Sequence, residues 1–395
     1  MQTLVTHSRP GIELLKNPIA GCFGNGNLPY PQERKEEMKE NRRIQGTKRP
    51  DRLPSRKPSE LVLLEQIRSR AACGSSHGVR LGIGDDCALL RLRAGEEMAV
   101  TTDLSIAGRH FRLDMHPAES VGHRALARGL SDLAAMGARP VAAFLSLGLP
   151  RELTKPSGRS PSWISRFYDG LLALAEAYET PLAGGDLAES PVAVADIVLV
   201  GAVPRGKALL RSGAQPGDLI YVTGSLGGAA AGLESLAELA AASEPAAKPP
   251  ARPKPLRIPR DFESLLAPHL YPQPRIEQGL WLRRRGLPTA AIDLSDGLST
   301  DLAHLCAESG VAAEVEAAQL PVRSGASIEQ ALHGGEDYEL LFTAPSAARM
   351  PRSVAGVPVT RIGRVLRARK GSPLITLVMP QGKQPLEPHG WEHFS

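Results

Sequence analysis

The sequence predicts a mixed α/β fold with two domains. Its 395 residues are enough for two domains, each with a buried core of its own. Short runs rich in β-branched residues alternate with amphipathic stretches, the pattern of strands and helices mixed along one chain. No apolar run approaches the ~20 residues of a membrane-spanning helix, and charged residues and proline interrupt the run at residues 13–18. We therefore expect a cytoplasmic protein with no membrane partner.

The first 58 residues predict a disordered basic extension. They mix Pro, Gly and Asn with dense charge, 12 Lys or Arg against 6 Asp or Glu, and have no apolar periodicity. The other residues carry 35 against 36, so the net charge of +5 belongs to the extension. A nucleic-acid partner is therefore disfavoured. A nucleic-acid-binding protein remains an alternative, resting on the extension alone, and would show steep salt dependence lost on its removal.

The elements of the folded body follow in order. A helix is expected from Ser59 as N-cap, with Leu61, Leu64 and Ile67 on one face. Strands are predicted at AVTT near residue 99, AAFLSLGL near 142, VADIVLVGAV near 194, LIYVT near 219 and ELLFT near 339.

Proline-rich stretches divide this body. Residues 150–162 predict a surface loop and residues 244–261 a surface insertion, because their prolines prevent regular structure. A Gly/Pro-rich connection after residue 203 places a domain boundary near 206, giving domains 59–205 and 206–395.

The four cysteines indicate neither a zinc site nor a disulfide framework. They have no Cys-x-x-Cys spacing, and we expect small buried residues. They are Cys22, Cys73, Cys87 and Cys306.

Six acidic motifs carry the chemical signal. Each has an aspartate predicted at a strand end or turn, beside glycine or small hydroxylated residues. They are GIGDDCALL (82–90), TTDLSIAGRHF (101–111), SDLAAMGA (131–138), GGDLAES (184–190), DLSDGLSTD (293–301) and GGEDYEL (334–340). One such motif alone is ordinary turn chemistry. Six indicate carboxylates that converge in a cleft, and oxygen ligands without His or Cys favour Mg²⁺. The sequence therefore predicts a magnesium-phosphate site.

Asp132 has two interpretations. It shares a helical stripe with Val121, Ala125 and Arg128, so it can pair with Arg128 one turn away. The same stripe should face protein, and a buried carboxylate needs a strong partner such as a metal ion. Both interpretations stay open.

The glycine-rich segment LGGAAAG (226–232) also has two interpretations. It follows a predicted strand and opens a helix, where backbone N–H groups can receive phosphate. It lacks the Gly-Lys-Ser/Thr of a P-loop, so we favour close helix packing.

In this order, the motifs resemble those of the thiamine-monophosphate kinases. That family belongs to a superfamily with aminoimidazole ribonucleotide synthetase, selenophosphate synthetase and a hydrogenase maturation factor. The resemblance runs from about residue 59 to the terminal HGWEHF. It implies an N-terminal domain that dimerises through its sheet, a C-terminal α/β domain, and an active site in the cleft between them. The implied substrates are ATP and thiamine monophosphate, and the implied cofactor is Mg²⁺.

The resemblance also implies site residues. The implied metal ligands are Asp86, Thr101, Thr102, Asp103, Asp132, Asp186, Asp293 and Asp296. Arg211 and Ser295 should contact ATP, and His110, Glu336 and Trp391 should contact thiamine phosphate. No protein general base is expected, because the attacking phosphate oxygen is already anionic.

Two related enzymes are alternatives. A selenophosphate synthetase would need a reactive Cys with a nearby Lys, and Cys73 in AACGSSHG has no such Lys. GGEDYEL resembles the thiamine enzyme more than aminoimidazole ribonucleotide synthetase.

Overall fold

The computed structural model describes residues 60–71, 78–156, 158, 160–242, 256 and 258–390. The predicted extension, the proposed N-cap Ser59, most of the insertion at 244–261, Cys22, Cys73 and Trp391 lie outside these residues.

A four-stranded sheet forms the first part of the described chain. Its strands β3 (Glu96–Ile106), β6 (Val194–Pro204), β4 (Arg139–Leu149) and β5 (Leu182–Glu189) lie in that order. β4 and β5 run parallel because α3 crosses between them, and the other neighbours are antiparallel. The strands predicted near 99, 142 and 194 are confirmed.

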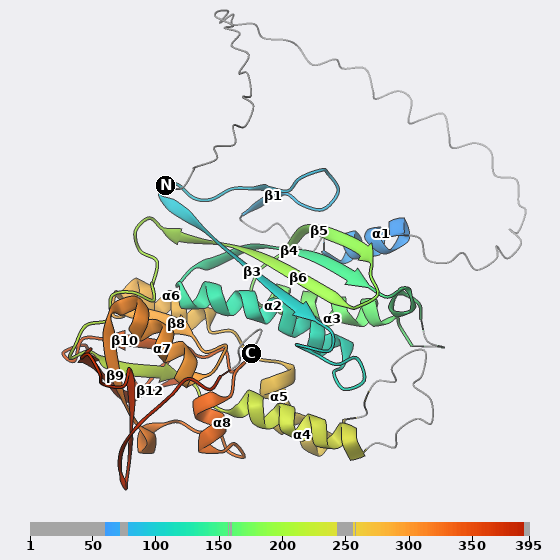
Figure 1. The fold of residues 1–395 in the computed structure, drawn as a ribbon. Coiled ribbons are helices and arrows are strands. Elements are labelled where there is room, and N and C mark those ends of the chain that lie inside the picture. The colour runs from blue at the N-terminus through green and yellow to red at the C-terminus, as the bar shows by residue number, and fades with distance from the viewer. Residues whose placement is uncertain are drawn as a thin grey trace, which may run out of the picture. The chain divides into compact units, whose positions relative to one another are not determined.

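Helices α2 (Ala118–Ala135) and α3 (Trp163–Ala177) cover one face of this sheet (Figure 1). They cross closely, because a Cβ on Gly122 would lie 1.9 Å from the Phe167 carbonyl oxygen, and a Cβ on Gly170 1.8 Å from that of Glu119. No residue larger than glycine fits at either position without displacing a helix.

The second sheet follows in the chain. β14, β13, β9, β12, β7, β10 and β8 are neighbours in that order, and β11 pairs with β12. The strands span Leu219–Thr223 (β7), Ala290–Asp293 (β8), Val311–Glu316 (β9), Leu340–Ala344 (β10), Ser353–Val354 (β11), Val357–Arg367 (β12), Ile375–Met379 (β13) and Gly382–Pro385 (β14). The strands predicted near 219 and 339 are confirmed. β8 is an edge strand of this sheet, yet all its residues are buried, because α2 packs against it.

The remaining helices are α4 (Gly228–Ala242), α5 (Glu263–Leu270), α6 (Ile276–Arg285), α7 (Leu298–Ser309), α8 (Ile328–His333) and the 3-10 turns Arg151–Thr154, Arg260–Phe262 and Ala317–Gln319. Most of them belong to the second part of the described chain, and α5 and α6 contact α2, whereas the 3-10 turn Arg151–Thr154 packs on α3. α6 approaches α2 so closely that a Cβ on Gly279 would lie 2.0 Å from the Ala134 carbonyl oxygen. α2 therefore packs both on its own sheet and against the C-terminal elements.

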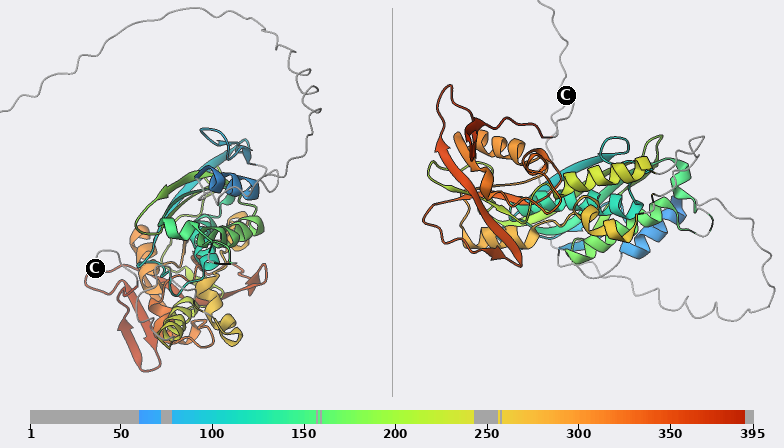
Figure 2. Two further views of the ribbon diagram at one scale, coloured as in Figure 1. Left: turned by 90° about the vertical axis from the view of Figure 1, so that its right-hand side faces the viewer. Right: turned by 90° about the horizontal axis from the view of Figure 1, so that it is seen from below.

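Three sequence-based predictions need correction. α1 (Glu60–Ala71) confirms the first helix, but Leu64 is exposed and Leu63 is the buried residue. Its buried face is set by packing against α3 and β5 (Figure 2). The predicted loop at 150–162 includes a 3-10 turn that buries Leu153. Cys87, after the hairpin strand β1 (Val79–Leu81) and before β2 (Leu89–Leu90), is exposed, whereas Cys306 is buried as expected.

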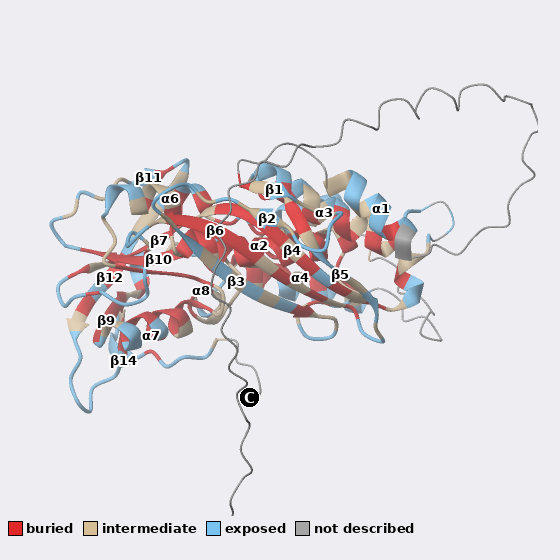
Figure 3. Cartoon of the chain, turned by 90° about the horizontal axis from the view of Figure 1, so that it is seen from above, coloured by how far each residue is buried: buried red, intermediate tan, exposed pale blue. Residues whose placement is uncertain are grey.

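Burial differs among the strands of the first sheet. Figure 3 shows α2, β4 and β6 as largely buried and β3 as exposed along part of its length. Among the described helices, none combines the length and apolar character needed to cross a membrane.

Candidate active site

A cavity of about 460 Å³ lies where β3 and α2 meet the segments around β8 and β10. Its walls come from both halves of the described chain, as expected for a cleft between domains. Seven of the predicted site residues line it: Asp103, His110, Asp132, Asp293, Ser295, Asp296 and Glu336.

The first wall of this cavity is β3 against α2. The Thr101 hydroxyl donates a hydrogen bond to Asp132 Oδ2. Arg128 Nε lies 3.6 Å from Asp103 Oδ1, so Arg128 forms its ion pair with Asp103 rather than with Asp132. Strand alternation puts Thr102 on the opposite, exposed face of β3. The expectation that the aspartates lie at strand ends or turns is wrong for three of them. Asp103 lies within β3, Asp132 within α2 and Asp186 within β5.

Uncompensated negative charge accumulates in the cavity. Asp293 ends β8 and accepts a hydrogen bond of 2.7 Å from the Ser131 hydroxyl. Burial, reinforced by the charge of Asp132, raises the pKa of Asp293 to about 7. Burial likewise raises the pKa of Asp103 to about 6, although Arg128 opposes the shift. A cation bound here would relieve this repulsion.

The turn after β8 carries Ser295 and Asp296. One carboxylate oxygen of Asp301 accepts the backbone N–H groups of Ser295, Asp296 and Gly297, at 3.1, 3.0 and 3.1 Å. Asp301 is 2% exposed and lies in the first turn of α7. It therefore fixes the turn, a role that the sequence did not reveal although Asp301 ends the DLSDGLSTD motif.

Glu336 and His110 line the same cavity as the aspartates. Both carboxylate oxygens of Glu336 lie 2.6 Å from Nη2 of Arg124 in α2. Burial raises the pKa of Glu336, but Arg124, His269 and Arg128 together outweigh burial and the pKa falls to about 2. The His110 ring accepts the Ile106 backbone N–H at Nδ1, 3.0 Å away. Arg124, 5% exposed, was not predicted, since its partner lies 212 residues away.

The start of α4 forms a further wall. The Gly227 and Ala229 N–H groups donate to the Asp337 carboxylate at 2.6 and 3.0 Å. A Cβ on Gly232 would lie 3.0 Å from His269 Cβ on α5. These contacts fit the packing interpretation of LGGAAAG, with Asp337 capping the helix.

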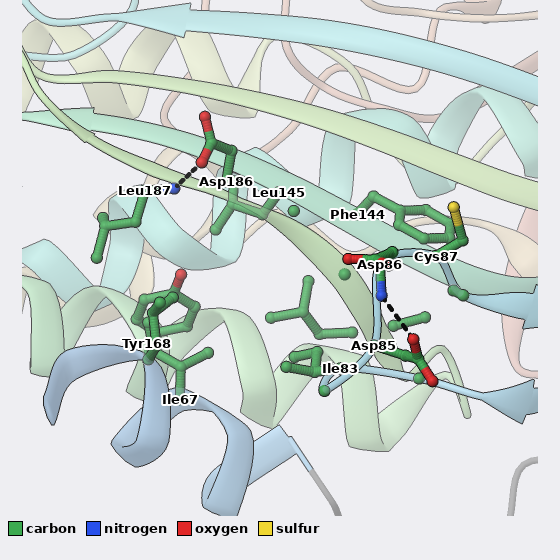
Figure 4. A pocket seen from close by; sticks show the side chains of 18 residues that line it. Ile67, Ile83, Asp85, Asp86, Cys87, Phe144, Leu145, Tyr168, Asp186 and Leu187 are labelled. Carbon is green, nitrogen blue, oxygen red and sulfur yellow. Dashed lines mark hydrogen bonds between the residues drawn. The ribbon is translucent and has the colours of Figure 1, made fainter. Parts of the chain in front are cut away.

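Three other predicted site residues lie elsewhere in the described chain. Asp86 and Asp186 are exposed and line a separate cavity of about 360 Å³ beside α1 and β5 (Figure 4). Arg211 is exposed and does not line the 460 Å³ cavity, although its charge opposes the raised pKa of Asp132 and Asp293.

The donor set suits Mg²⁺ in part. The cavity offers carboxylate oxygens, the ligands that this ion prefers. Within the described ranges, no three His, Cys, Asp or Glu side chains are grouped closely enough to hold a metal ion by themselves. This agrees with the usual Mg²⁺ site, in which one or two carboxylates share the ion with substrate phosphates and water.

Comparisons with known proteins define the class. Residues 84–204 match the model of the AIR synthase related protein, N-terminal domain, and residues 215–375 that of the C-terminal domain. The fold and cavity therefore belong to a protein of the AIR synthase related class.

Individual relatives define the family. The chain is 41% identical over 329 residues to the thiamine-monophosphate kinase of Salmonella typhimurium, covering 80% of this chain and 93% of the relative. The Bacillus subtilis thiamine-monophosphate kinase is 32% identical, with 85% and 99% covered. The crystal structure of the Stenotrophomonas maltophilia thiamine-monophosphate kinase gives a TM-score of 0.65 at 39% identity, covering 81% and 96%. The structure of AaThiL complexed with AMPPCP and TMP gives 0.62 at 30% identity, covering 87% and 99%. The chain belongs to the thiamine-monophosphate kinase family.

Proposed function

We propose that the protein transfers the γ-phosphoryl group of ATP to thiamine monophosphate, giving thiamine diphosphate and ADP. The observation that carries the proposal is one cavity that unites Asp103, Asp132, Asp293 and Asp296 with Glu336. It lies in a chain whose relatives are thiamine-monophosphate kinases.

The chemistry needs positioning rather than a protein base. The nucleophile is a phosphate oxygen that is anionic at neutral pH, so no side chain has to remove a proton from it. The barrier comes from bringing two polyanions into line. We therefore assign no general base and give the cavity residues binding and orienting roles.

We propose Asp103, Asp132, Asp293 and Asp296 as the central Mg²⁺ ligands, with Thr101 beside Asp103 on the same face of β3. Thr102 lies on the other face of β3, so its side chain is not assigned to this group. The raised pKa values of Asp103 and Asp293 support this role, since each results from burial and neighbouring carboxylates that nearby arginines only partly offset. Bound there, Mg²⁺ would offset the charge of the phosphates and the carboxylates.

The remaining site residues are assigned to one or the other of the two substrates. We propose that Ser295 and Arg211 contact ATP, because Ser295 lies on the turn held by Asp301 and the charge of Arg211 lowers the pKa of both Asp132 and Asp293. His110, Glu336 and Trp391 are assigned to thiamine monophosphate. An ionised Glu336 suits the cationic thiazolium of thiamine, and an indole can stack on the same ring.

We propose a cytoplasmic homodimer that forms through the open face of the four-stranded sheet. Met98, Val100 and Leu104 alternate along β3 and are 54%, 57% and 47% exposed, so they form an apolar stripe on the face away from α2. A second copy of this face would bury the stripe.

The same dimer accounts for Asp86 and Asp186. β3 and β5 are opposite edges of the sheet, about 14 Å apart at the usual strand spacing, so Asp186 and Asp103 of one chain cannot share an ion. We propose that Asp86 and Asp186 of the second copy enter the site formed by Asp103 of the first. Mixing inactive Asp103→Asn and Asp186→Asn subunits should then restore up to about a quarter of the activity, because half of the dimers are mixed and each has one intact site. No recovery in mixed dimers would place both residues in the site of one chain.

The activity assay compares two acceptors. With ATP and Mg²⁺, thiamine monophosphate should give thiamine diphosphate and ADP in equal amounts by chromatography, whereas thiamine should give no product. Excess chelator should abolish the reaction. Equal turnover of thiamine, or full activity with chelator, would overturn the proposed function.

A further inference from the structure

Two buried histidines line the same cavity as Glu336, and the proposed function gives neither of them a role. His116 precedes α2 and His269 lies on α5, and they are 4% and 1% exposed. Their Nε2 atoms lie 3.0 Å apart. His269 Nδ1 lies 3.5 Å from Glu336 Oε2, and no hydrogen-bond partner satisfies it in the described part of the chain.

The surrounding backbone fixes which nitrogens carry protons. His116 Nδ1 is 3.1 Å from the Arg112 N–H and 3.2 Å from the Arg112 carbonyl oxygen. That carbonyl already accepts the N–H groups of Met115 and His116, whereas the Arg112 N–H is directed at Nδ1. Nδ1 of His116 is therefore an acceptor without a proton.

The proton positions then follow along the chain of contacts. A neutral His116 carries its proton on Nε2 and donates to Nε2 of His269. His269 must therefore carry its own proton on Nδ1, the nitrogen that faces Glu336. Burial keeps both rings neutral, lowering the pKa of His116 to about 4 and that of His269 well below its ordinary value. The contacts form one directional chain from the Arg112 backbone to the Glu336 carboxylate.

Glu336 needs a hydrogen-bond donor besides Arg124 to fix the orientation of its carboxylate. Both of its carboxylate oxygens meet the same atom, Nη2 of Arg124, so this ion pair fixes the distance of the carboxylate but leaves it able to rotate. A donor from another direction removes that rotation.

We propose that His269 is a positioning residue that orients Glu336 for thiamine monophosphate. Its Nδ1–H completes a hydrogen bond to Oε2 when the substrate occupies the cavity, and His116 holds His269 in the required tautomer. This inference rests on the proposed function, because it assumes that Glu336 contacts thiamine monophosphate.

Two substitutions of His269 separate positioning from packing. In His269→Asn the amide can occupy the place of ring Nδ1 and still donate to Glu336. In His269→Gln the longer amide reaches the place of Nε2, near His116, and the donor to Glu336 is lost. We expect the Kd for thiamine monophosphate to rise about 10-fold in the Gln variant and to stay within about 3-fold in the Asn variant. His123→Gln is the matched control, because His123 is a buried histidine whose Nε2 contacts the Pro272 carbonyl oxygen instead.

The measurement is titration calorimetry of thiamine monophosphate into each variant without metal or ATP, followed by steady-state kinetics. The KM for thiamine monophosphate should follow the Kd, with kcat and the KM for ATP unchanged. Equal Kd values for the Asn and Gln variants would overturn the inference. If His269→Gln does not fold, His116→Phe tests the same series of hydrogen bonds, because it removes the donor that sets the His269 tautomer. An unchanged Kd for thiamine monophosphate in that variant would also overturn the inference. A parent protein that neither binds nor phosphorylates thiamine monophosphate would refute the proposed function instead.

Discussion

Replacing Arg124 with methionine should destabilise the protein and weaken thiamine monophosphate binding together. Methionine fills similar space but leaves the half-buried Glu336 carboxylate without its main cation. Arg124 and its neighbours hold the pKa of Glu336 at about 2 instead of 4.5, which corresponds to about 3 kcal/mol of stabilisation of the ionised form. Loss of one partner of a buried pair costs a similar amount, about 3–5 kcal/mol.

Thermal unfolding at pH 7 measures the effect, with an expected fall in Tm of roughly 5 °C. The folded-state pKa of Glu336 is depressed, so its contribution is present above about pH 4.5 and is lost as the pH falls toward 2. The difference between parent and variant should therefore shrink in acid. Arg151→Met is the control, because the Arg151–Glu189 pair is exposed and its loss should leave Tm unchanged. An Arg124→Met protein with the Tm and KM of the parent would refute the reasoning.

Four further changes have distinct expected results. Asp132→Asn should lower kcat by orders of magnitude with Tm retained, because the amide keeps the size of the side chain but loses its charge; near-parental kcat would remove it from the site. Gly122→Ala should cost about 3 kcal/mol in denaturant unfolding, because its methyl group meets the Phe167 carbonyl; an unchanged midpoint would contradict the close crossing. Trp391→Ala should raise the KM for thiamine monophosphate roughly 2- to 30-fold and leave that for ATP unchanged, and an equal rise for both would exclude a stacking role. Deleting residues 1–58 should leave kcat and KM unchanged, because no predicted site residue lies there, and lost activity would refute this.

Local patterns predicted β3, β4 and β6 of the first sheet, and β7 and β10 of the second, but not the other strands. The β-branched runs near residues 99 and 194 correctly predicted strands β3 and β6, which pair with each other. Such residues favour a strand through their own shape, because they fit a pleated, packed surface. The buried face of α1 was predicted incorrectly. Leu63 rather than Leu64 is buried, since α3 and β5 decide which side of α1 is covered.

The candidate site was predicted in its motifs but not in its supporting contacts. Asp103, Asp132 and Asp293 stood out as aspartates within repeated small-residue motifs. Arg124 and His269 had no such signal, because their importance comes from partners 212 and 153 residues away along the chain. Contacts between distant segments depend on how α2 and α5 pack, and a local pattern does not contain that information.

The most direct test of the central claim follows the phosphoryl group itself. ATP labelled in its γ-phosphoryl group is incubated with the protein, Mg²⁺ and unlabelled thiamine monophosphate, and the products are separated. Direct in-line transfer predicts that the label appears in the terminal phosphate of thiamine diphosphate in equal amount to the ADP formed. Label recovered only as inorganic phosphate, or no thiamine diphosphate at all, would contradict the account.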